Sequence, residues 1–300
     1  MNLQVKDTFR QAIKLVGRNH KFLWLFWATN IAFATIISLP IYYMLSNNLM
    51  HSVLSDSLSS GFDYIWYLQF RRLYQTNIGE MPYIIYGTAG VYVLIQTFFL
   101  GGLVSIFHNT KKNHYVDFFF GGVKYWYRFT KVLLISLVFY ALAFKINDLS
   151  GQFLTYAFAN QEKIIFEFIL RASRYVLLIF LLGLVTIVGD YLKVSLGVKD
   201  SSHVFGEIYP VLNFLRENFS RIVILFFFTA LLGAIGAIIY NLLNDLLPKS
   251  HYVYLLLTFI LQQFLIIFRL SIKMLFTATE VIIYKDIKAQ VIPTQVEEVI

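Results

Sequence analysis

Four neutral amide side chains interrupt long apolar stretches of the sequence, and their chemistry is hydrogen bonding rather than catalysis. They are Asn30, Gln96, Gln262 and Gln263. Inside a membrane such amides bond from helix to helix, for about 1 kcal/mol each. The same groups could instead line a polar path for a transported molecule, because intramembrane polar residues often mark function. The sequence leaves both interpretations open.

Two ionisable residues, Asp190 and Arg269, also fall within apolar stretches. Counted at about 1.5 Å per helical residue, both reach nearly the same depth close to one membrane boundary. An unpaired charge at that depth is costly, so we expect the two side chains to form an ion pair. The alternatives are that each extends separately to the interface, or that Asp190 pairs locally with Lys193.

Motifs for catalysis and metal binding are missing from the sequence. The six histidines show no HExxH spacing, and the chain has no cysteine. Neither a nucleophile elbow, a phosphate-binding loop nor a dinucleotide fingerprint occurs. We therefore predict that the protein is not an enzyme and has no cofactor and no metal site.

The elements that hold these residues are predicted to be membrane-spanning helices. Apolar residues make up 58% of the 300 positions and charged residues only 14%, a composition far from that of a soluble domain. Because a hydrocarbon core of roughly 30 Å needs about twenty helical residues, six segments qualify as spans. They are 22–45, 83–107, 132–144 with its flanks, 175–196, 222–243 and 252 to about 276.

The distribution of basic residues predicts the orientation of these spans. With six spans across the membrane, most of the 25 Lys and Arg residues lie on the same side of the membrane as the N-terminus. The positive-inside rule then places both termini in the cytoplasm, and we expect a bacterial inner-membrane location. The net charge of +8 is explained without nucleic-acid binding, because basic loops of membrane proteins contact anionic lipid headgroups.

Three similar junctions precede the first, third and fifth spans. They read "RNHKFLWLF", "YRFTKVLLIS" and "RENFSRIVILFFF", with Lys21, Lys131 and Arg221 in equivalent places. We interpret the whole chain, 1–300, as a single all-α membrane bundle of three hairpin repeats, about 1–110, 111–200 and 201–290, followed by a short tail at 287–300.

A surface helix is expected before each of these three spans. Apolar residues share one face in the first (Phe9, Ala12, Ile13, Val16) and in the third (Phe205, Ile208, Leu212, Leu215, Phe219). Gly121 and Gly122 make the second helix less regular. Basic amphipathic helices of this kind lie in the cytoplasmic interface or pack on one another as a cap. The predicted membrane-interface anchors are Lys6, Arg10, Lys14, Arg18, Lys21, Arg128, Lys131, Arg216 and Arg221.

The longest external connection, 46–81, has an aromatic-rich centre with helical spacing at Phe62, Ile65 and Trp66. Such a segment suits the outer headgroup layer. It is either a docking site for a protein partner or an interfacial lid.

Two regions carry a resemblance to known proteins: "FFLGGLVSIFHNTKKNHYVDFFFGGVKYWYRFTKVLL" (98–134) and "GDYLKVSLGVKDSSHVFGEIYPVLNFLRENFSRIVIL" (189–225). They resemble linker regions of a loosely defined group of uncharacterised bacterial polytopic membrane proteins. The pattern is also similar to the membrane domain attached to some glycerophosphodiester phosphodiesterases, although the soluble domain with its metal-binding residues is missing from this sequence. The resemblance implies a bacterial cytoplasmic membrane location and a non-catalytic helical bundle.

These observations predict a non-enzymatic membrane protein that acts as a scaffold, as a membrane subunit of an assembly or as an organiser of lipid. The alternative is a small transporter or lipid-handling permease. Its pathway would run between the three hairpins, lined by Asn30, Gln96 and Gln262.

Overall fold

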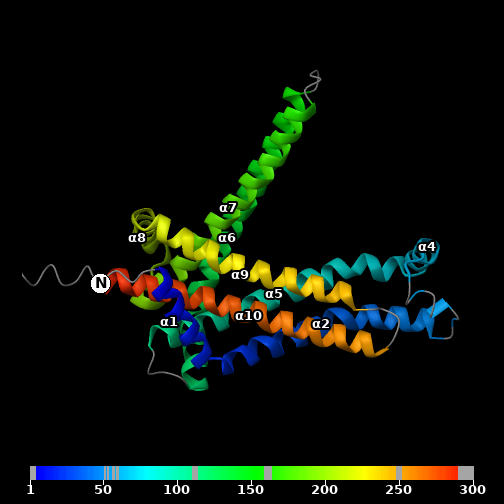
Figure 1. Ribbon diagram of the computed structural model, residues 1–300, viewed down its shortest axis with the longest axis horizontal. Helices are drawn as coiled ribbons and strands as arrows, with labels where there is room; N and C mark the ends of the chain where they lie inside the picture. The colour runs from blue at the N-terminus through cyan, green and yellow to red at the C-terminus, as the bar shows by residue number, and fades with distance from the viewer. Residues whose placement is uncertain are drawn as a thin grey trace, which may run out of the picture. The chain divides into compact units, whose positions relative to one another are not determined.

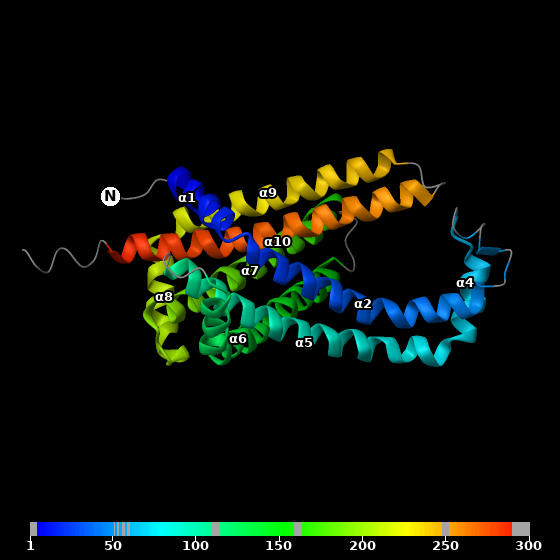
Figure 2. The same ribbon diagram turned by 90° about the horizontal axis from the view of Figure 1, so that it is seen from below.

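The computed structural model describes residues 5–50, 52, 54–55, 58, 61–109, 114–158, 164–247 and 252–289, and these residues form helices and no strand. The helices are α1 (Val5–Arg18), α2 (Lys21–Leu49), α4 (Tyr64–Leu73), α5 (Gln75–His108), α6 (Tyr115–Ala157), α7 (Ile164–Lys199), α8 (Val204–Glu217), α9 (Phe219–Leu246) and α10 (Tyr252–Ala289) (Figures 1 and 2). Most of the predicted tail, 287–300, lies outside the described residues.

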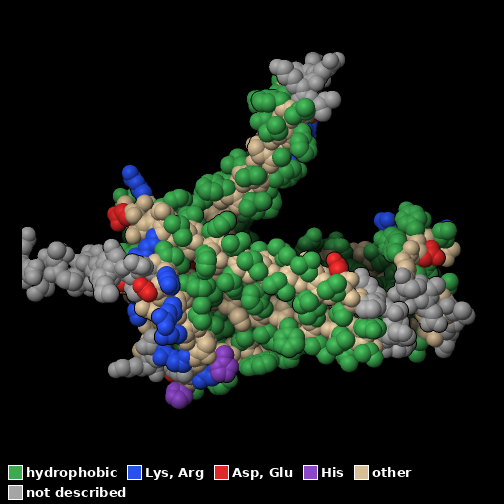
Figure 3. All heavy atoms as spheres, in the orientation of Figure 1, with side chains coloured by type: hydrophobic (Ala, Val, Ile, Leu, Met, Phe, Trp, Pro, Cys, Tyr) green, Lys and Arg blue, Asp and Glu red, His purple; other side chains and the backbone are tan. Residues whose placement is uncertain are grey.

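Six of these helices, α2, α5, α6, α7, α9 and α10, are long and apolar enough to cross a membrane. The shortest, α9, has 28 residues and would be about 42 Å long, more than the hydrocarbon core requires. Hydrophobic side chains cover the long helices, whereas Lys and Arg gather over α1 and beside α8 (Figure 3). The predicted all-α bundle of a multi-pass membrane protein is thereby confirmed.

Contacts divide the chain into two compact units, which are described one at a time. Unit 1 comprises Met1–Leu15, Thr97–Phe227 and Phe276–Ile300, and unit 2 comprises Val16–Gln96 and Phe228–Leu275. The helices α1, α5, α9 and α10 contribute residues to both units. The two units are defined by contacts between residues and not by similarity between segments of the sequence. The three hairpin repeats therefore stay a prediction.

In unit 1, α6 packs along α7, and α7 packs against α8. Glycines bring α5 and α6 close together. A Cβ added at Gly102 would lie 2.7 Å from the backbone oxygen of Phe118, and one added at Gly121 would lie 2.4 Å from the Cβ of Ser105. Helix approach this close requires residues without side chains, as is typical of membrane helix contacts. The glycines of α6 thus serve packing and do not interrupt the helix.

The three junctions differ in structure. The chain leaves helical geometry between α1 and α2 and again between α8 and α9, at Asn218, whose side-chain Nδ2 donates to the backbone oxygen of Phe214 at 3.0 Å. The middle junction has no break, because α6 continues through Arg128 to Ala157. The second surface helix and the third span are therefore one helix of 43 residues. Asn competes for backbone hydrogen bonds and ends helices, whereas Arg favours their continuation.

In unit 2 the predicted helix within the external connection 46–81 is present as α4. Asp63 caps its N-terminus, since its Oδ1 accepts hydrogen bonds from the backbone N–H groups of Ile65 and Trp66 at 2.8 and 3.1 Å. The indole of Trp66 donates to Asn48 Oδ1 at 3.2 Å, which attaches α4 to the end of α2. Its large side chains Tyr64 and Ile65 and the preceding Phe62 are exposed.

Candidate functional site

Three long helices of unit 2 are tied to one another by one side-chain hydrogen bond for each pair. We call this set the amide seam. Its bonds are Tyr92 Oη to Asn30 Oδ1 (2.7 Å, α5 to α2), Trp27 Nε1 to Gln263 Oε1 (3.1 Å, α2 to α10) and Lys273 Nζ to Gln96 Oε1 (2.7 Å, α10 to α5). Each amide bonds to a different neighbouring helix, so the seam closes a triangle of contacts.

The structure brings three of the four predicted amides into this seam. Gln262 is exposed, because neighbouring residues on a helix point about 100° apart and Gln263 takes the inward position. The donors Trp27, Tyr92 and Lys273 were not predicted. Aromatic residues make up 18% of this sequence, so no local signal separates a buried hydrogen-bond donor from an interfacial side chain.

Lys273 is the charged member of the amide seam. Its ammonium donates to a neutral amide and also lies 5.6 Å from the centre of the Phe26 ring, within the range of a cation–π contact. Gln96 is only 6% exposed, and its Nε2 has no hydrogen-bond partner. The seam is therefore compact around Gln96 and leaves the NH₂ group of that amide without an acceptor.

Asp190 on α7 pairs with a residue of its own helix. Lys193 Nζ donates to Asp190 Oδ1 at 2.9 Å, which is the local pairing considered as an alternative from the sequence. Arg269 belongs to unit 2 and is exposed, whereas Asp190 belongs to unit 1. The ion pair between Asp190 and Arg269 stays a prediction.

Glu280 on α10 joins Asp190 and Lys193 in unit 1, and the sequence did not single it out. Its side chain is 8% exposed and interacts electrostatically with both of those residues. Asp190 is the carboxylate in direct contact with the Lys193 ammonium, which is itself largely buried. Glu280 was missed because it lies beyond the apolar run that ended the sixth predicted span near Phe276, while α10 continues to Ala289.

A second polar group in unit 1 surrounds Ser195 on α7. Ser195 Oγ donates to Glu207 Oε2 of α8 at 2.9 Å and shares a hydrogen bond of 2.7 Å with Tyr284 Oη of α10. Glu207 also binds Lys199. A serine beside a lysine and a tyrosine has the composition of a nucleophile site, but Ser195 is fully buried. The arrangement instead fastens α7, α8 and α10 together.

Two of the predicted interface anchors bind carboxylates of the protein itself. Arg221 on α9 pairs with Asp286 on α10 at 3.2 Å, and Arg128 on α6 pairs with Asp200 at 2.9 Å. Lys124 also donates to Asp200, at 2.6 Å. The hydrogen bond from Lys124, followed by that from Arg128, lowers the pKa of the Asp200 carboxyl below its ordinary value. Asp200 has a positive φ of 56°, a left-handed conformation that Asp and Asn tolerate better than most residues.

The other anchors lie mainly at the surface. The exposed ones are Lys6, Arg10, Lys14, Arg18, Lys131 and Arg216, and Lys21 is partly exposed with its Nζ 5.3 Å from the Phe22 ring centre. Helix α1 buries Thr8, Ala12 and Leu15. Its basic residues therefore lie along the outer side of the helix.

Helix α8 has apolar residues on both its inner and outer sides. Val204, Val211 and Leu215 are buried, at spacings of seven and four residues. Phe205, Tyr209 and Leu212 are exposed. Leu215 therefore faces inward, away from the face on which the sequence placed it with Phe205 and Leu212. The apolar arc of this helix is wider than one packing face, and its outer part has no described contact that buries it.

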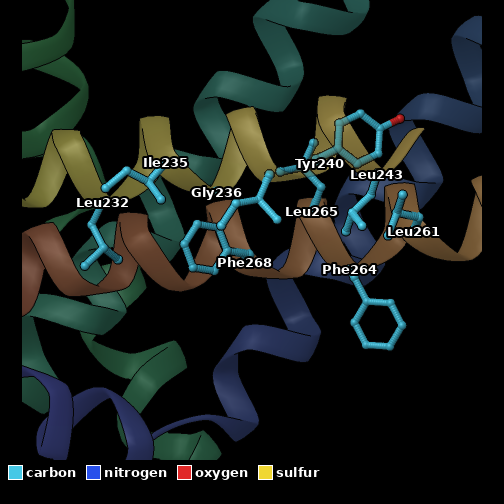
Figure 4. Close-up of a pocket in the computed structure, with 10 residues that line it drawn as sticks. Leu232, Ile235, Gly236, Tyr240, Leu243, Leu261, Phe264, Leu265 and Phe268 are labelled. Carbon is cyan, nitrogen blue, oxygen red and sulfur yellow. The ribbon is translucent and has the colours of Figure 1, made fainter. Parts of the chain in front are cut away.

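An open apolar groove of about 420 Å³ runs between α9 and α10 in unit 2. Gly236 of α9 forms part of it and faces the ring of Phe268, which lies between the two helices, whereas Phe264 points away from α9 (Figure 4). None of the amides of the seam lines this groove. Its lining suits a hydrocarbon chain and offers no binding group to a polar solute.

No group of three or more His, Asp or Glu side chains within the described residues is arranged to hold a metal ion. Comparison of the chain with protein-family models, with curated proteins and with solved structures found no match. The resemblance to membrane domains of glycerophosphodiester phosphodiesterases therefore stays a prediction.

Proposed function

We propose that the protein is a non-enzymatic scaffold of a bacterial cytoplasmic membrane, with both termini in the cytoplasm and with anionic lipid headgroups as its partners on that side. One observation carries the proposal. Two of the three amides that would line a transport path, Asn30 and Gln96, bond helix to helix in the amide seam, and the third, Gln262, is exposed.

The groove between α9 and α10 supports the same function. A transporter for a polar solute needs polar groups along its path, and this groove is lined by apolar side chains of the two helices. Lipid acyl chains fill such a surface without any dedicated binding group. The groove thus fits a protein that contacts or organises lipid.

The contact with the cytoplasmic leaflet would be made by α1 and α8. Exposed Lys6, Arg10 and Lys14 on α1 suit anionic headgroups, and exposed Phe205 and Tyr209 on α8 suit the acyl boundary. The exposed aromatic helix α4 is a candidate docking site for a protein partner within 46–81.

Single-cysteine labelling tests the proposal, because the chain has no cysteine that must first be removed. Asn30→Cys and Gln96→Cys are placed singly in the full chain, in sealed vesicles, and treated with a membrane-impermeant thiol reagent. A scaffold with a dry seam leaves both unlabelled. Labelling of either position would support the pathway of a transporter or permease instead.

Two exposed positions provide the controls and the topology. Gln11→Cys on α1 and Gly61→Cys before α4 should both label in opened vesicles. In sealed vesicles of known orientation, Gln11→Cys is expected to label only from the cytoplasmic side and Gly61→Cys only from the opposite side. Labelling of both from the same side would contradict the proposed orientation.

A further inference from the structure

The hairpin of α6 and α7 contains a polar pocket of about 720 Å³ that no predicted site includes. Three of the residues that line it are cationic: Lys145 on α6 and Arg171 and Arg174 on α7. Asp148 is the one acidic residue in its lining, and Glu167 pairs with Arg171 at 2.7 Å. Cations exceed carboxylates even with Glu167 counted, so the pocket is suited to an anion.

The position of Arg174 is set by a glycine. Its guanidinium lies across the buried Gly151 of α6, so close that a Cβ at Gly151 would come within 1.7 Å of Arg174 Nη1. The same guanidinium donates from Nη2 to Tyr175 Oη at 2.9 Å. Its Nε is buried and has no hydrogen-bond partner. A buried guanidinium N–H without an acceptor is costly, and an anion in the pocket would supply one.

Other polar groups converge on the same pocket. Thr155 lines it, donates its hydroxyl hydrogen to the backbone oxygen of Gly151 at 3.0 Å and accepts a hydrogen bond from Arg171 Nη2 at 3.3 Å, so it helps to position Arg171. Gln152 lies in the lining as well. Guanidinium and ammonium donors together match the oxygens of a phosphate group.

Exposed apolar side chains flank the pocket along both helices. Leu142 and Phe144 precede it on α6, and Val176 and Leu177 follow it on α7. On α7, Arg174 and Lys193 are separated by about 29 Å at 1.5 Å per residue, close to the thickness of a hydrocarbon core. The pocket therefore lies at the headgroup level of one leaflet, and the ion pair of Lys193 lies at the level of the other leaflet.

We propose that this pocket binds the phosphate group of an anionic phospholipid in the leaflet where the pocket lies. The inference requires that the chain spans a membrane, but it does not depend on the scaffold function or on the basic surface of α1. Arg174 and Lys145 hold the phosphate, and the flanking apolar side chains contact the acyl chains of the same lipid.

The test uses the full chain in neutral detergent with Phe153→Cys, an exposed position next to the pocket, labelled with an environment-sensitive fluorophore. Phosphatidylglycerol is titrated, with phosphatidylcholine and inorganic phosphate as separate arms. Phosphatidylglycerol is expected to bind about tenfold more tightly than phosphatidylcholine. Arg174→Gln should weaken the binding of phosphatidylglycerol by about tenfold, since it removes charge-assisted hydrogen bonds.

Gly151→Ala is the sharper variant, because it keeps every charge and displaces only the guanidinium. It should weaken phosphatidylglycerol to a similar degree. The matched controls are Gly183→Ala, a helical glycine with open space around its Cβ position, and Arg71→Gln on α4. Both should bind like the parent chain. If Arg174→Gln does not fold, Lys145→Gln replaces an exposed cation and should weaken binding by about threefold.

Equal affinity for the two lipids would overturn the proposal. So would unchanged phosphatidylglycerol binding both in Gly151→Ala and in the charge variant, Arg174→Gln or Lys145→Gln. A third such outcome is an equal response to inorganic phosphate at the same concentration. The last would assign the pocket to a soluble anion. A second label at Gln11→Cys reports lipid at α1 separately. A fluorescence response at Gln11→Cys without a response at Phe153→Cys rejects the pocket and retains the scaffold proposal. A response at Phe153→Cys without a response at Gln11→Cys supports the pocket and rejects the lipid contact of α1 in the scaffold proposal.

Discussion

The two units of the molecule fasten their helices with different chemistry. In unit 2 the amide seam joins three helices through neutral amides, aromatic donors and a single ammonium. In unit 1, charged groups are matched with charged groups, as in Arg221 with Asp286 and Lys193 with Asp190. Neutral groups are cheaper to place in hydrocarbon than ions, whereas ions near helix ends retain access to water and headgroups. The basic residues Arg221 and Lys193 of unit 1 are thus structural.

This contrast predicts that breaking an ion pair in unit 1 costs more than breaking a bond of the amide seam. Replacement of Asp286 by Asn should lower the free energy of unfolding by about 3 kcal/mol, because Arg221, only 17% exposed, would lose its carboxylate. Thermal and denaturant unfolding of the full chain in detergent measure the effect. Glu217→Gln on the exposed side of α8 is the control. A loss no greater than that of this control would remove the distinction between the units.

Close helix approach in unit 1 is the next largest effect. Gly102→Ala should destabilise the chain by about 2 kcal/mol, since its Cβ would press on the backbone of Phe118, which cannot rotate away. Gly90→Ala on the same helix, α5, has nothing within 4 Å and should be neutral or slightly stabilising. Equal unfolding midpoints for these two variants would show that α5 and α6 are not in close contact in the membrane.

The amide seam is expected to contribute less per bond. Asn30→Leu and Tyr92→Phe should each cost about 1 kcal/mol, and the double variant should cost little more than either one, because both remove the same hydrogen bond. The unfolding free energies of the four proteins form the cycle that measures this coupling. Gln262→Leu, at an exposed amide, should leave stability unchanged. Strict additivity of the two substitutions would mean that the bond is absent.

The smallest effect concerns the exposed ion pairs of Asp200. Its folded pKa is depressed, so its stabilisation is complete above the unfolded pKa near 3.8 and is lost as the pH falls through the lower folded value. Half of the Asp200 side chain is exposed, and we expect less than about 1 kcal/mol. Asp200→Asn preserves the left-handed backbone preference and removes the charge. The difference in unfolding midpoint between parent and variant should therefore shrink from pH 6 to pH 3, and a constant difference would exclude the ion pairs as its cause.

The sequence was sufficient for the helices and for the acceptors of the seam. Long apolar runs predict spans whatever their partners, and an amide in such a run is visible at once, as with Asn30, Gln96 and Gln263. Which side chain donates to each amide depends on helix rotation and proximity. Tyr92 and Trp27 look the same in the sequence as aromatic residues that face lipid.

The ends of the helices were harder to predict. Lys145, Asn147 and Asp148 ended the third predicted span, yet α6 continues past them to Ala157. Hydropathy reports where a helix leaves hydrocarbon, whereas backbone hydrogen bonding decides where the helix stops. The cationic pocket and Glu280 both lie in these helical extensions, so a search confined to apolar runs omitted them. The ion pair of Asp190 with Arg269 stays a prediction for a related reason, since depth along two helices does not fix which faces meet.

The unbroken course of α6 has a mechanical consequence. A regular helix of 43 residues, about 63 Å long, resists bending, and α6 contains no proline and no capping Asn where the other two junctions have their breaks. Its N-terminal half is held by Asp200 through Lys124 and Arg128, and its C-terminal half carries Lys145 and Gly151 of the cationic pocket. A change of tilt at one end of α6 is therefore transmitted along the helix to its other end.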